Sequence, residues 1–286
     1  RTLSCNRMHG LTFGSFAKAL PNKMMGAPGS GGPILNVNTT DTLTGRRIMA
    51  AINPMTGGAG GTKSADGSEG SGANAGFLKN TPVEVNEVEA GIRVHRYGLK
   101  LDSGGAGFNR GGLGTDFVFQ ALSPNTKITA RNRDRTRFSG WGIEKGYPGG
   151  ASIFIKNPGK ENEFNLKNTD ILTLDPNDII HVSCGGGGGW GSPLERDPLK
   201  VLLDVQKGWV SIEGAKSDYG VIITKVNKSN NNFTQFDLNL VETKKLRTIL
   251  RNKFNRIKNN TNFFRFCSSR IEYEKNWNYE SYDVLT

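Results

Sequence analysis

The sequence predicts an α+β fold: a mostly antiparallel β domain with glycine-rich connections, followed by helices near the C-terminus. Apolar and polar residues alternate through the middle of the chain, as in Ile92 to Arg96 and Phe117 to Ala121, which is typical of strands with one buried face. Glycine-rich turns separate these runs, and the chain contains 38 glycines. After Pro198 the apolar spacing becomes helical, and the 286 residues suffice for a sizeable core.

The N-terminal elements are a short helix and a strand pair. The segment "RMHGLTFGSFAKALP" has apolar residues at helical spacing and stops at Pro21. The chain starts at Arg1, inside this pattern and without Met, so we expect an N-terminal part to be missing. "PILNV" and "RRIMAAINP" predict two strands joined by the turn "TDTLTGR". "GGAGGTKSADGSEGSGANAG" then predicts either a flexible loop or a backbone-dense surface that its neighbours order.

The central part predicts a series of strands. Alternation favours strands at residues 83–87, 92–96, 117–121 and 128–130, and again in "ASIFIK" and "DIIHVS". Turn sequences such as "SPNT", "GYPGG" and "NPGKEN" separate several of them. A mostly antiparallel domain follows from these short connections.

The C-terminal part predicts helices around one returning strand. Asp197 can cap a helix that starts at Pro198 and ends at Gly208, and Ser211 can cap a second that ends at "DYG". "VIIT" predicts a strand, and residues 227–232 predict a polar linker. We therefore divide the chain into a first part, 1–225, and a linker with a helical tail, 226–286. The apolar positions of the first and last helices are Leu199, Leu202 and Leu203, and Leu246, Ile249, Leu250 and Ile257.

Charge and cysteine content bound the class of protein. The formal net charge is +11. From Val221 onward there are twelve Lys or Arg and six Asp or Glu, so more than half of the excess positive charge lies in the last quarter of the chain. No nucleic-acid-binding motif accompanies it, and we expect a solvated basic face and no nucleic-acid partner. Cys5, Cys184 and Cys267 are odd in number and far apart, which is typical of reduced thiols. No apolar run is long enough to span a membrane, so we expect a cytoplasmic protein without a membrane partner.

Several short motifs lack residues that their chemistry requires. "GGAGGTKS" has Thr62 where a phosphate-binding loop needs glycine, and Arg110 interrupts the dinucleotide pattern of "DSGGAGFNRGGLG". His9, His95 and His181 are scattered, without the spacing of metal ligands. Cys184 follows a predicted strand, where a buried thiol is commoner than a nucleophile.

The stretch "SCGGGGGWGSPLERDP" from Ser183 to Pro198 leaves three interpretations: a phosphate cradle, a flexible linker, or tight backbone beside a site. Ionic residues beside glycine turns can hold an anion or brace loops by ion pairs. We select the following residues for binding an intermediate or shaping a site: Asp102, Gly104, Gly105, Arg110, Arg133, Arg137, Gly186, Gly187, Gly188, Glu195 and Arg196. No catalytic residue and no metal ligand is assigned.

Three long runs resemble the C-terminal half of the hydantoinase B/oxoprolinase family. They are "NTPVEVNEVEAGIRVHRYGLKLDSGGAGFNRGGLG", "RDRTRFSGWGIEKGYPGG" and "GGGGGWGSPLERDPLKVLLDVQKGWVSIEGAKSDYGVII". The similarity runs from about residue 17 to 223 in the order of the family, and "RIEYEKNWNYESYDVL" is similar to the tail of N-methylhydantoinase-type members, so we expect an intact C-terminus. The asparagine-rich linker departs from the pattern.

The resemblance implies the B component, here N-terminally truncated, of an ATP-dependent hydrolase that opens cyclic amides such as hydantoins or 5-oxoproline. In that family an A-type subunit or domain binds ATP and activates the amide oxygen as a phosphate ester. Metal ligands belong to the region before Arg1, so the resemblance implies no cofactor on this segment, ATP on the partner, and a divalent metal in the missing region. The isolated fragment is then expected to be inactive within a hetero-oligomeric system. The alternatives are a subunit of a related ketone carboxylase and a non-catalytic β-rich docking module.

For the quoted glycines, the resemblance favours the third interpretation, a tight passage from strand to helix near the site. Glycine there permits positive φ and close backbone approach, and free amides can meet an anionic intermediate.

Overall fold

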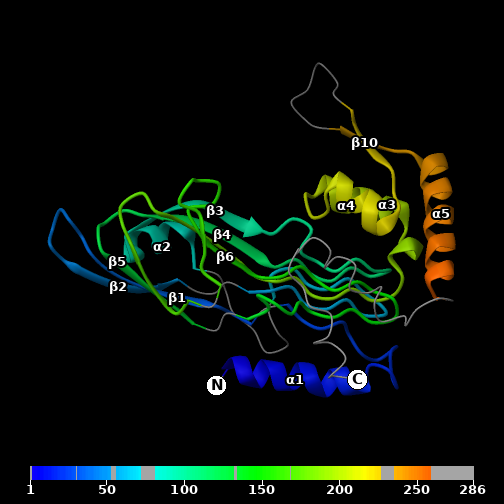
Figure 1. The fold of residues 1–286 in the computed structure, drawn as a ribbon, viewed down its shortest axis with the longest axis horizontal. Coiled ribbons are helices and arrows are strands. Elements are labelled where there is room, and N and C mark those ends of the chain that lie inside the picture. Colours follow the sequence, from blue (N-terminus) through cyan, green and yellow to red (C-terminus); the bar gives the residue numbers. More distant parts are fainter. Residues whose placement is uncertain are drawn as a thin grey trace.

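A computed structural model describes residues 2–29, 31–52, 56–71, 81–131, 134–167, 169–226 and 235–258. Two antiparallel sheets pack face to face at one end of the molecule, and the C-terminal helices gather at the other end (Figure 1). Between them extended segments without helix or strand run side by side. The α+β class, with helices in the C-terminal part, is therefore confirmed.

The four-stranded sheet has the order β2-β1-β5-β8. Its strands are β1 (Ile34–Thr40), β2 (Arg47–Ile52), β5 (Thr126–Arg131) and β8 (Ile171–Leu174). The predicted hairpin of β1 and β2 is confirmed, with Leu35 opposite Ile52. β8 was not predicted.

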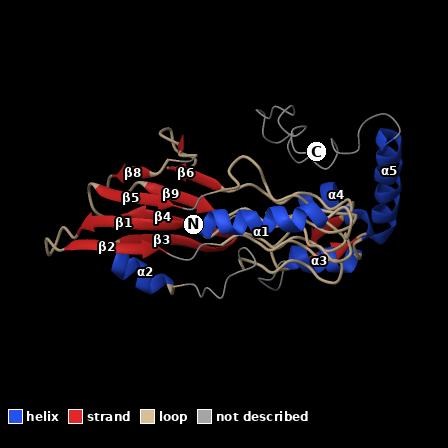
Figure 2. Ribbon diagram, turned by 90° about the horizontal axis from the view of Figure 1, so that it is seen from below, coloured by secondary structure: helices blue, strands red, loops and turns tan. Residues whose placement is uncertain are grey.

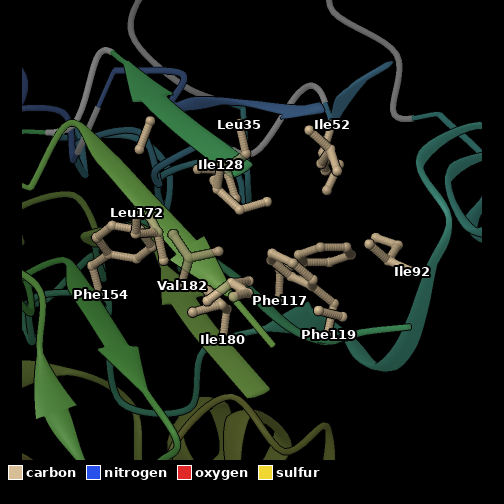
Figure 3. Packing of buried hydrophobic residues seen from close by; sticks show 14 of the residues in the cluster. Leu35, Ile52, Ile92, Phe117, Phe119, Ile128, Phe154, Leu172, Ile180 and Val182 are labelled. Atoms are coloured by element: carbon tan, nitrogen blue, oxygen red, sulfur yellow. The ribbon is translucent and has the colours of Figure 1, made fainter. Parts of the chain in front are cut away.

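The five-stranded sheet has the order β3-β4-β9-β6-β7. Its strands are β3 (Ile92–Leu99), β4 (Thr115–Ala121), β6 (Ile153–Lys156), β7 (Phe164–Asn165) and β9 (Ile179–Ser183). Alternate residues of the two sheets meet in one core, in which Leu35, Phe117, Phe119, Ile128 and Ile180 are at most 1% exposed (Figure 3). This burial is what the alternation predicts.

The prediction of a strand at 83–87 is wrong, because Val83–Ala90 forms helix α2. Pro82 precedes its first turn, Gly91 ends it in the left-handed conformation, and Asn86 and Ala90 are its buried residues. A spacing of four places both on one side of a helix, and this side packs beside the edge strands β2 and β3. Tertiary packing here outweighs the strand preference of the valines.

The C-terminal part contains η1 (Pro193–Glu195), α3 (Pro198–Gln206), α4 (Ile212–Tyr219), β10 (Ile223–Val226), β11 (Gln235–Leu238) and α5 (Leu240–Lys258). Asp197 caps α3 and Ser211 caps α4, as predicted. The apolar face predicted for α3 is wrong at Leu199 and Leu203, which are exposed, and right at Leu202, which packs against the core. Val201 and Val205 form the rest of the buried face.

In α5, Leu246 and Leu250 are half-buried, but Ile249 is 64% exposed, contrary to the predicted stripe. The side chain of Ile257 and the linker 227–232 lie outside the described residues. The division at residue 225 stays a prediction.

The N-terminal helix α1 (Thr2–Phe16) confirms the predicted helix and lies along the extended segments (Figure 2). No helix among the described residues combines the length and the apolar character that crossing a bilayer requires.

Candidate functional site: a glycine layer joined to a buried arginine cluster

The segment Gly185–Gly189 is the centre of what we call the glycine layer: residues 26–29, 58–61, 103–114, 140–150 and 185–189. Its amides donate outward in turn, Gly186 to Gly150 O (3.1 Å), Gly187 to Gly112 O (2.9 Å) and Gly188 to Ala27 O (2.8 Å). Gly189 then donates to Tyr147 O (2.9 Å), which returns to the segment that Gly186 contacts. A repeat of three residues without internal hydrogen bonds is the geometry of a polyproline II-type helix.

Close backbone approach is the reason for glycine at these positions. A Cβ on Gly186, Gly187 or Gly188 would overlap the carbonyl oxygen of Ser103, Ala59 or Trp141, well inside the 3.0 Å that real Cβ contacts respect. None of the three has a positive φ, so the expectation that positive φ requires them is wrong. Positive φ occurs one turn later, at Gly191 (φ 73°).

The expectation that free amides here meet an anionic intermediate is also wrong. The amides of all five glycines are donated within the protein, that of Gly185 to Ser152 Oγ (3.0 Å) and the other four to backbone carbonyls. An amide that is already bonded offers no unsatisfied donor to an oxyanion. The segment is a packed wall. The flexible-linker and phosphate-cradle interpretations are therefore also wrong, because the backbone is held on several sides and offers no free amide.

Gly104 and Gly105 belong to the adjacent segment of the layer, and Asp102 directly precedes this segment. Gly105 N donates to Gly187 O (2.8 Å), and a Cβ on Gly104 would overlap Gly111 O. Asp102 has φ 57°, and its Oδ1 accepts from Ser211 N (2.9 Å) at the start of α4. This carboxylate therefore fastens the layer to the helical part.

Arg110 lies on the same segment and is 1% exposed. Its Nη2 donates to Glu69 Oε1 (2.6 Å), its Nη1 donates to Gly111 O (2.7 Å), and its guanidinium lies 5.1 Å from the ring centre of Trp209. Glu69 also accepts the amide of Leu113. Arg110 therefore anchors residues 56–71 to the layer.

Arg196 forms the second half of the cluster and is also 1% exposed. It bonds both oxygens of Asp66 (2.7 and 2.8 Å) and Asp204 Oδ2 (2.8 Å). Its own carbonyl accepts from Arg247 Nη2 of α5 (2.7 Å). Such bidentate pairing uses the planar fork of arginine and joins the layer, α3 and α5 at one point.

The pKa values of the two aspartates that pair with Arg196 are shifted in opposite directions from the ordinary value. Burial raises the pKa of Asp204 above its ordinary value, although Arg196 and Arg110 oppose this shift. Burial acts in the same sense on Asp66, but the hydrogen bond and charge of Arg196 outweigh it and lower the pKa of that carboxyl. The difference follows from exposure, since the side chain of Asp66 is 34% exposed and that of Asp204 only 6%.

The remaining candidates lie elsewhere. Glu195 is exposed, and Arg137 is exposed with its guanidinium over the ring of Phe138 (5.2 Å). Arg133 lies outside the described residues. The structure thus brings together eight of the eleven selected residues: Asp102, Gly104, Gly105, Arg110, Gly186, Gly187, Gly188 and Arg196.

Sequence reasoning missed Asp66, Glu69 and Asp204, the carboxylates that pair with these arginines. Asp66 and Glu69 are the two acids of "SADGSEG", a stretch predicted as either a flexible loop or a backbone-dense surface that its neighbours order. The hydrogen bonds of residues 56–71 to the layer select the second alternative. Isolated acids in a glycine-rich stretch were the available signal, because buried arginines require paired carboxylates.

Histidines and cysteines form no centre in the described part of the chain. His181 Nε2 contacts Asp116 Oδ1 (2.7 Å), His95 contacts Gln120 (2.9 Å), and Cys184 is buried in the core. Among the described residues no group of three His, Cys, Asp or Glu is placed to hold a metal ion. The described residues therefore do not fit a metal, and we derive no chemical step through one.

A family model described as hydantoinase B/oxoprolinase matches residues 1–193. The chain belongs to the hydantoinase B/oxoprolinase family. An uncharacterized protein of Methanocaldococcus jannaschii is 43% identical over 59% of this chain and 28% of its own length. Caprolactamase subunit beta of Pseudomonas jessenii is 34% identical over 62% of this chain and 31% of its own length.

Two solved structures resemble the chain as well. The ATP-dependent caprolactamase from Pseudomonas jessenii matches with a TM-score of 0.64 and 27% identity, over 82% of this chain and 40% of the other. The fold also matches nucleotide-free acetone carboxylase, with a TM-score of 0.71 and 18% identity, over 90% of this chain and 37% of the other. The matched region spans about a third of the length of the curated relatives.

Proposed function

We propose that this chain is the B component of an ATP-dependent hydrolase that opens hydantoin-type or 5-oxoproline-type rings together with an ATP-binding A-type partner. The family match over residues 1–193 carries the proposal. The name of the caprolactamase relative, an ATP-dependent enzyme with a beta subunit, supports both a cyclic-amide substrate and a second subunit.

The role proposed for the described residues is to form a rigid wall. The glycine layer satisfies its own amides, and the cluster of Arg110 and Arg196 fixes it to α3 and α5. Rigid backbone of this kind holds neighbouring groups in register and supports a site on adjoining elements. ATP binding belongs to the partner in this proposal, and a divalent metal belongs to the region that precedes Arg1 in the family.

The test is ring opening by the reconstituted system. The chain is co-expressed with an A-type subunit, with and without the metal-binding region of the family. Opening of hydantoin, 5-oxoproline and caprolactam is measured by chromatography with and without ATP and Mn²⁺ or Mg²⁺. We expect no turnover by the chain alone and ATP-dependent turnover only where the metal-binding region is also supplied. Failure of every ring under all these conditions would refute the proposal.

A docking module without catalysis is the second candidate, which the satisfied amides of the glycine layer favour. Binding of the A-type subunit, with no turnover even after the metal-binding region is added, would select it. A ketone carboxylase component is the third, which the fold match to acetone carboxylase favours. ATP-dependent incorporation of labelled bicarbonate into acetone would select that function.

A further inference from the structure

The helix α1 exposes its large apolar side chains. It meets the glycine layer through Arg7, which donates to Gly29 O (3.1 Å) and pairs with Asp134 (3.0 Å), and through Gly14, where a Cβ would lie 2.9 Å from the ring of Trp141. Met8 and Leu11, by contrast, are 66% and 71% exposed. An amphipathic helix on a folded body normally buries its large apolar residues, so this arrangement is inverted.

The outer face of the four-stranded sheet lies on the same side of the molecule as α1 (Figure 2). Its outward-facing side chains include the exposed cations Arg47, Lys127 and Arg131, and the described strands place no Asp or Glu on this face. The central strand β1 directs Asn36 and Asn38 outward, although asparagine is disfavoured in strands. The face thus combines exposed cations and hydrogen-bonding groups with two exposed apolar side chains, Met49 and Ile171.

The area of this sheet face is too small for a stable interface by itself. Four strands about 4.8 Å apart and about six residues long cover on the order of 400 Å². A stable protein interface needs roughly 800 Å² from each partner. The N-terminal end of α1 lies beside the ends of these strands, and the helix runs from there along the extended segments on the same side of the molecule (Figure 2). Its exposed apolar side chains therefore extend the area available on this side, next to a charged polar region, which is the usual composition of an interface.

We propose that the outer face of the four-stranded sheet and the exposed side of α1 form one docking surface, the α1–sheet face, for an acidic surface of the A-type partner subunit. This inference rests on the proposed function for the identity of the partner. Arg47, Lys127 and Arg131, with no carboxylate among the described strands of this face, are complementary to negative charge on the partner. The exposed Met8, Leu11 and Phe16 of α1 are complementary to an apolar contact on the same side. The sheet face carries no aromatic side chain for stacking bases, which disfavours single-stranded nucleic acid.

Two sets of variants separate the charged and apolar parts. The first is Arg47→Gln, Lys127→Gln and Arg131→Gln together, matched by Lys200→Gln, Lys216→Gln and Lys244→Gln, which remove equal charge from exposed sites on the helices α3, α4 and α5. The second is Leu11→Gln with Phe16→Gln, matched by Leu199→Gln with Leu203→Gln on α3. Thermal unfolding confirms that each variant is folded.

The measurement is binding of the co-expressed A-type subunit by calorimetry at low and high salt. We expect each α1–sheet variant to weaken binding by roughly tenfold or more, the charge variant also to lose salt dependence, and both control sets to bind as the unaltered chain. Equal binding by all folded variants would overturn this surface while leaving the proposed function intact. No binding by the unaltered chain would overturn both.

Two further probes identify competing occupants. Duplex DNA and vesicles of phosphatidylcholine with phosphatidylserine are titrated against the same variants. Loss of DNA or vesicle binding in the α1–sheet variants, with binding of the A-type subunit unchanged, would replace the proposed partner by that ligand. The proposal stands if the A-type subunit alone responds.

Discussion

Replacing Gly187 by alanine tests the packing of the glycine layer. The added Cβ would overlap the carbonyl of Ala59, whose oxygen accepts from Gly112 N (2.7 Å). Gly187 itself donates to Gly112 O (2.9 Å) and accepts from Gly105 N (2.8 Å), so moving Gly187 and Ala59 apart strains three hydrogen bonds in all. One methyl group therefore affects three segments at once.

The expected loss in the free energy of unfolding is large. Forced overpacking costs about 1–3 kcal/mol, and each of three strained hydrogen bonds contributes about 1 kcal/mol. The total, roughly 4–6 kcal/mol, is a substantial part of the 5–15 kcal/mol typical of a folded domain. The urea midpoint should then fall by roughly 1 M or more.

Gly98→Ala is the matched control for this measurement. Gly98 lies in β3 without a positive φ, and a Cβ there meets no atom within 4 Å. Alanine is expected to be neutral or to stabilise by about 0.5–1 kcal/mol. Both variants are unfolded in urea and followed by circular dichroism and tryptophan fluorescence. If Gly187→Ala kept the midpoint of the unaltered chain, the close packing of this segment would be refuted.

Three further predictions concern the arginine cluster. Arg196→Met should lower stability by about 3–5 kcal/mol, because it leaves Asp204 buried without its closest cation, whereas Arg137→Met at an exposed site should stay within about 0.5 kcal/mol in thermal melts. The pKa of Asp66 is lowered in the folded state, so its ionised carboxylate stabilises the fold above the ordinary pKa of 3.8, and this stability is lost as the pH falls. Asp66→Asn should therefore reduce the fall of the urea midpoint between about pH 5 and 2. An unchanged fall of the midpoint would contradict this. Tyr219 is buried and its hydroxyl contacts no described hydrogen-bond partner, so Tyr219→Phe should leave the melting temperature unchanged or raise it, and a marked fall would disprove the assignment.

The sequence allowed the sheets to be predicted because their alternation is a direct consequence of having one buried face. Leu35 with Val37 and Phe117 with Phe119 are two residues apart and buried, as this pattern requires. Helix α2 was not predicted because its valines alternate as in a strand, whereas the residues that it buries are Asn86 and Ala90. Only the packing beside β2 and β3 decides between the two patterns, and packing is not visible in a local window.

The candidate site was predictable in composition but not in chemistry. The glycines and arginines near the turns do converge, yet Gly187 is needed for close approach rather than for positive φ. The two requirements give the same residue in sequence and differ only in which atoms lie nearby. The partners Asp66 and Asp204, 138 positions apart, meet on Arg196 only through the fold.

The satisfied amides change what a substitution in the glycine run would measure. A larger residue such as valine at position 187 would be the direct way to test whether the glycine run serves ring opening. The overlap with Ala59 means that such a change would first unfold the layer, so lost turnover could not locate a site there. Charge removal on the exposed α1–sheet face leaves the core untouched, which makes it the sharper probe of how this chain serves a larger enzyme. Weaker binding of the A-type subunit by a fully folded variant would connect this chain to catalysis through assembly rather than through its own glycines.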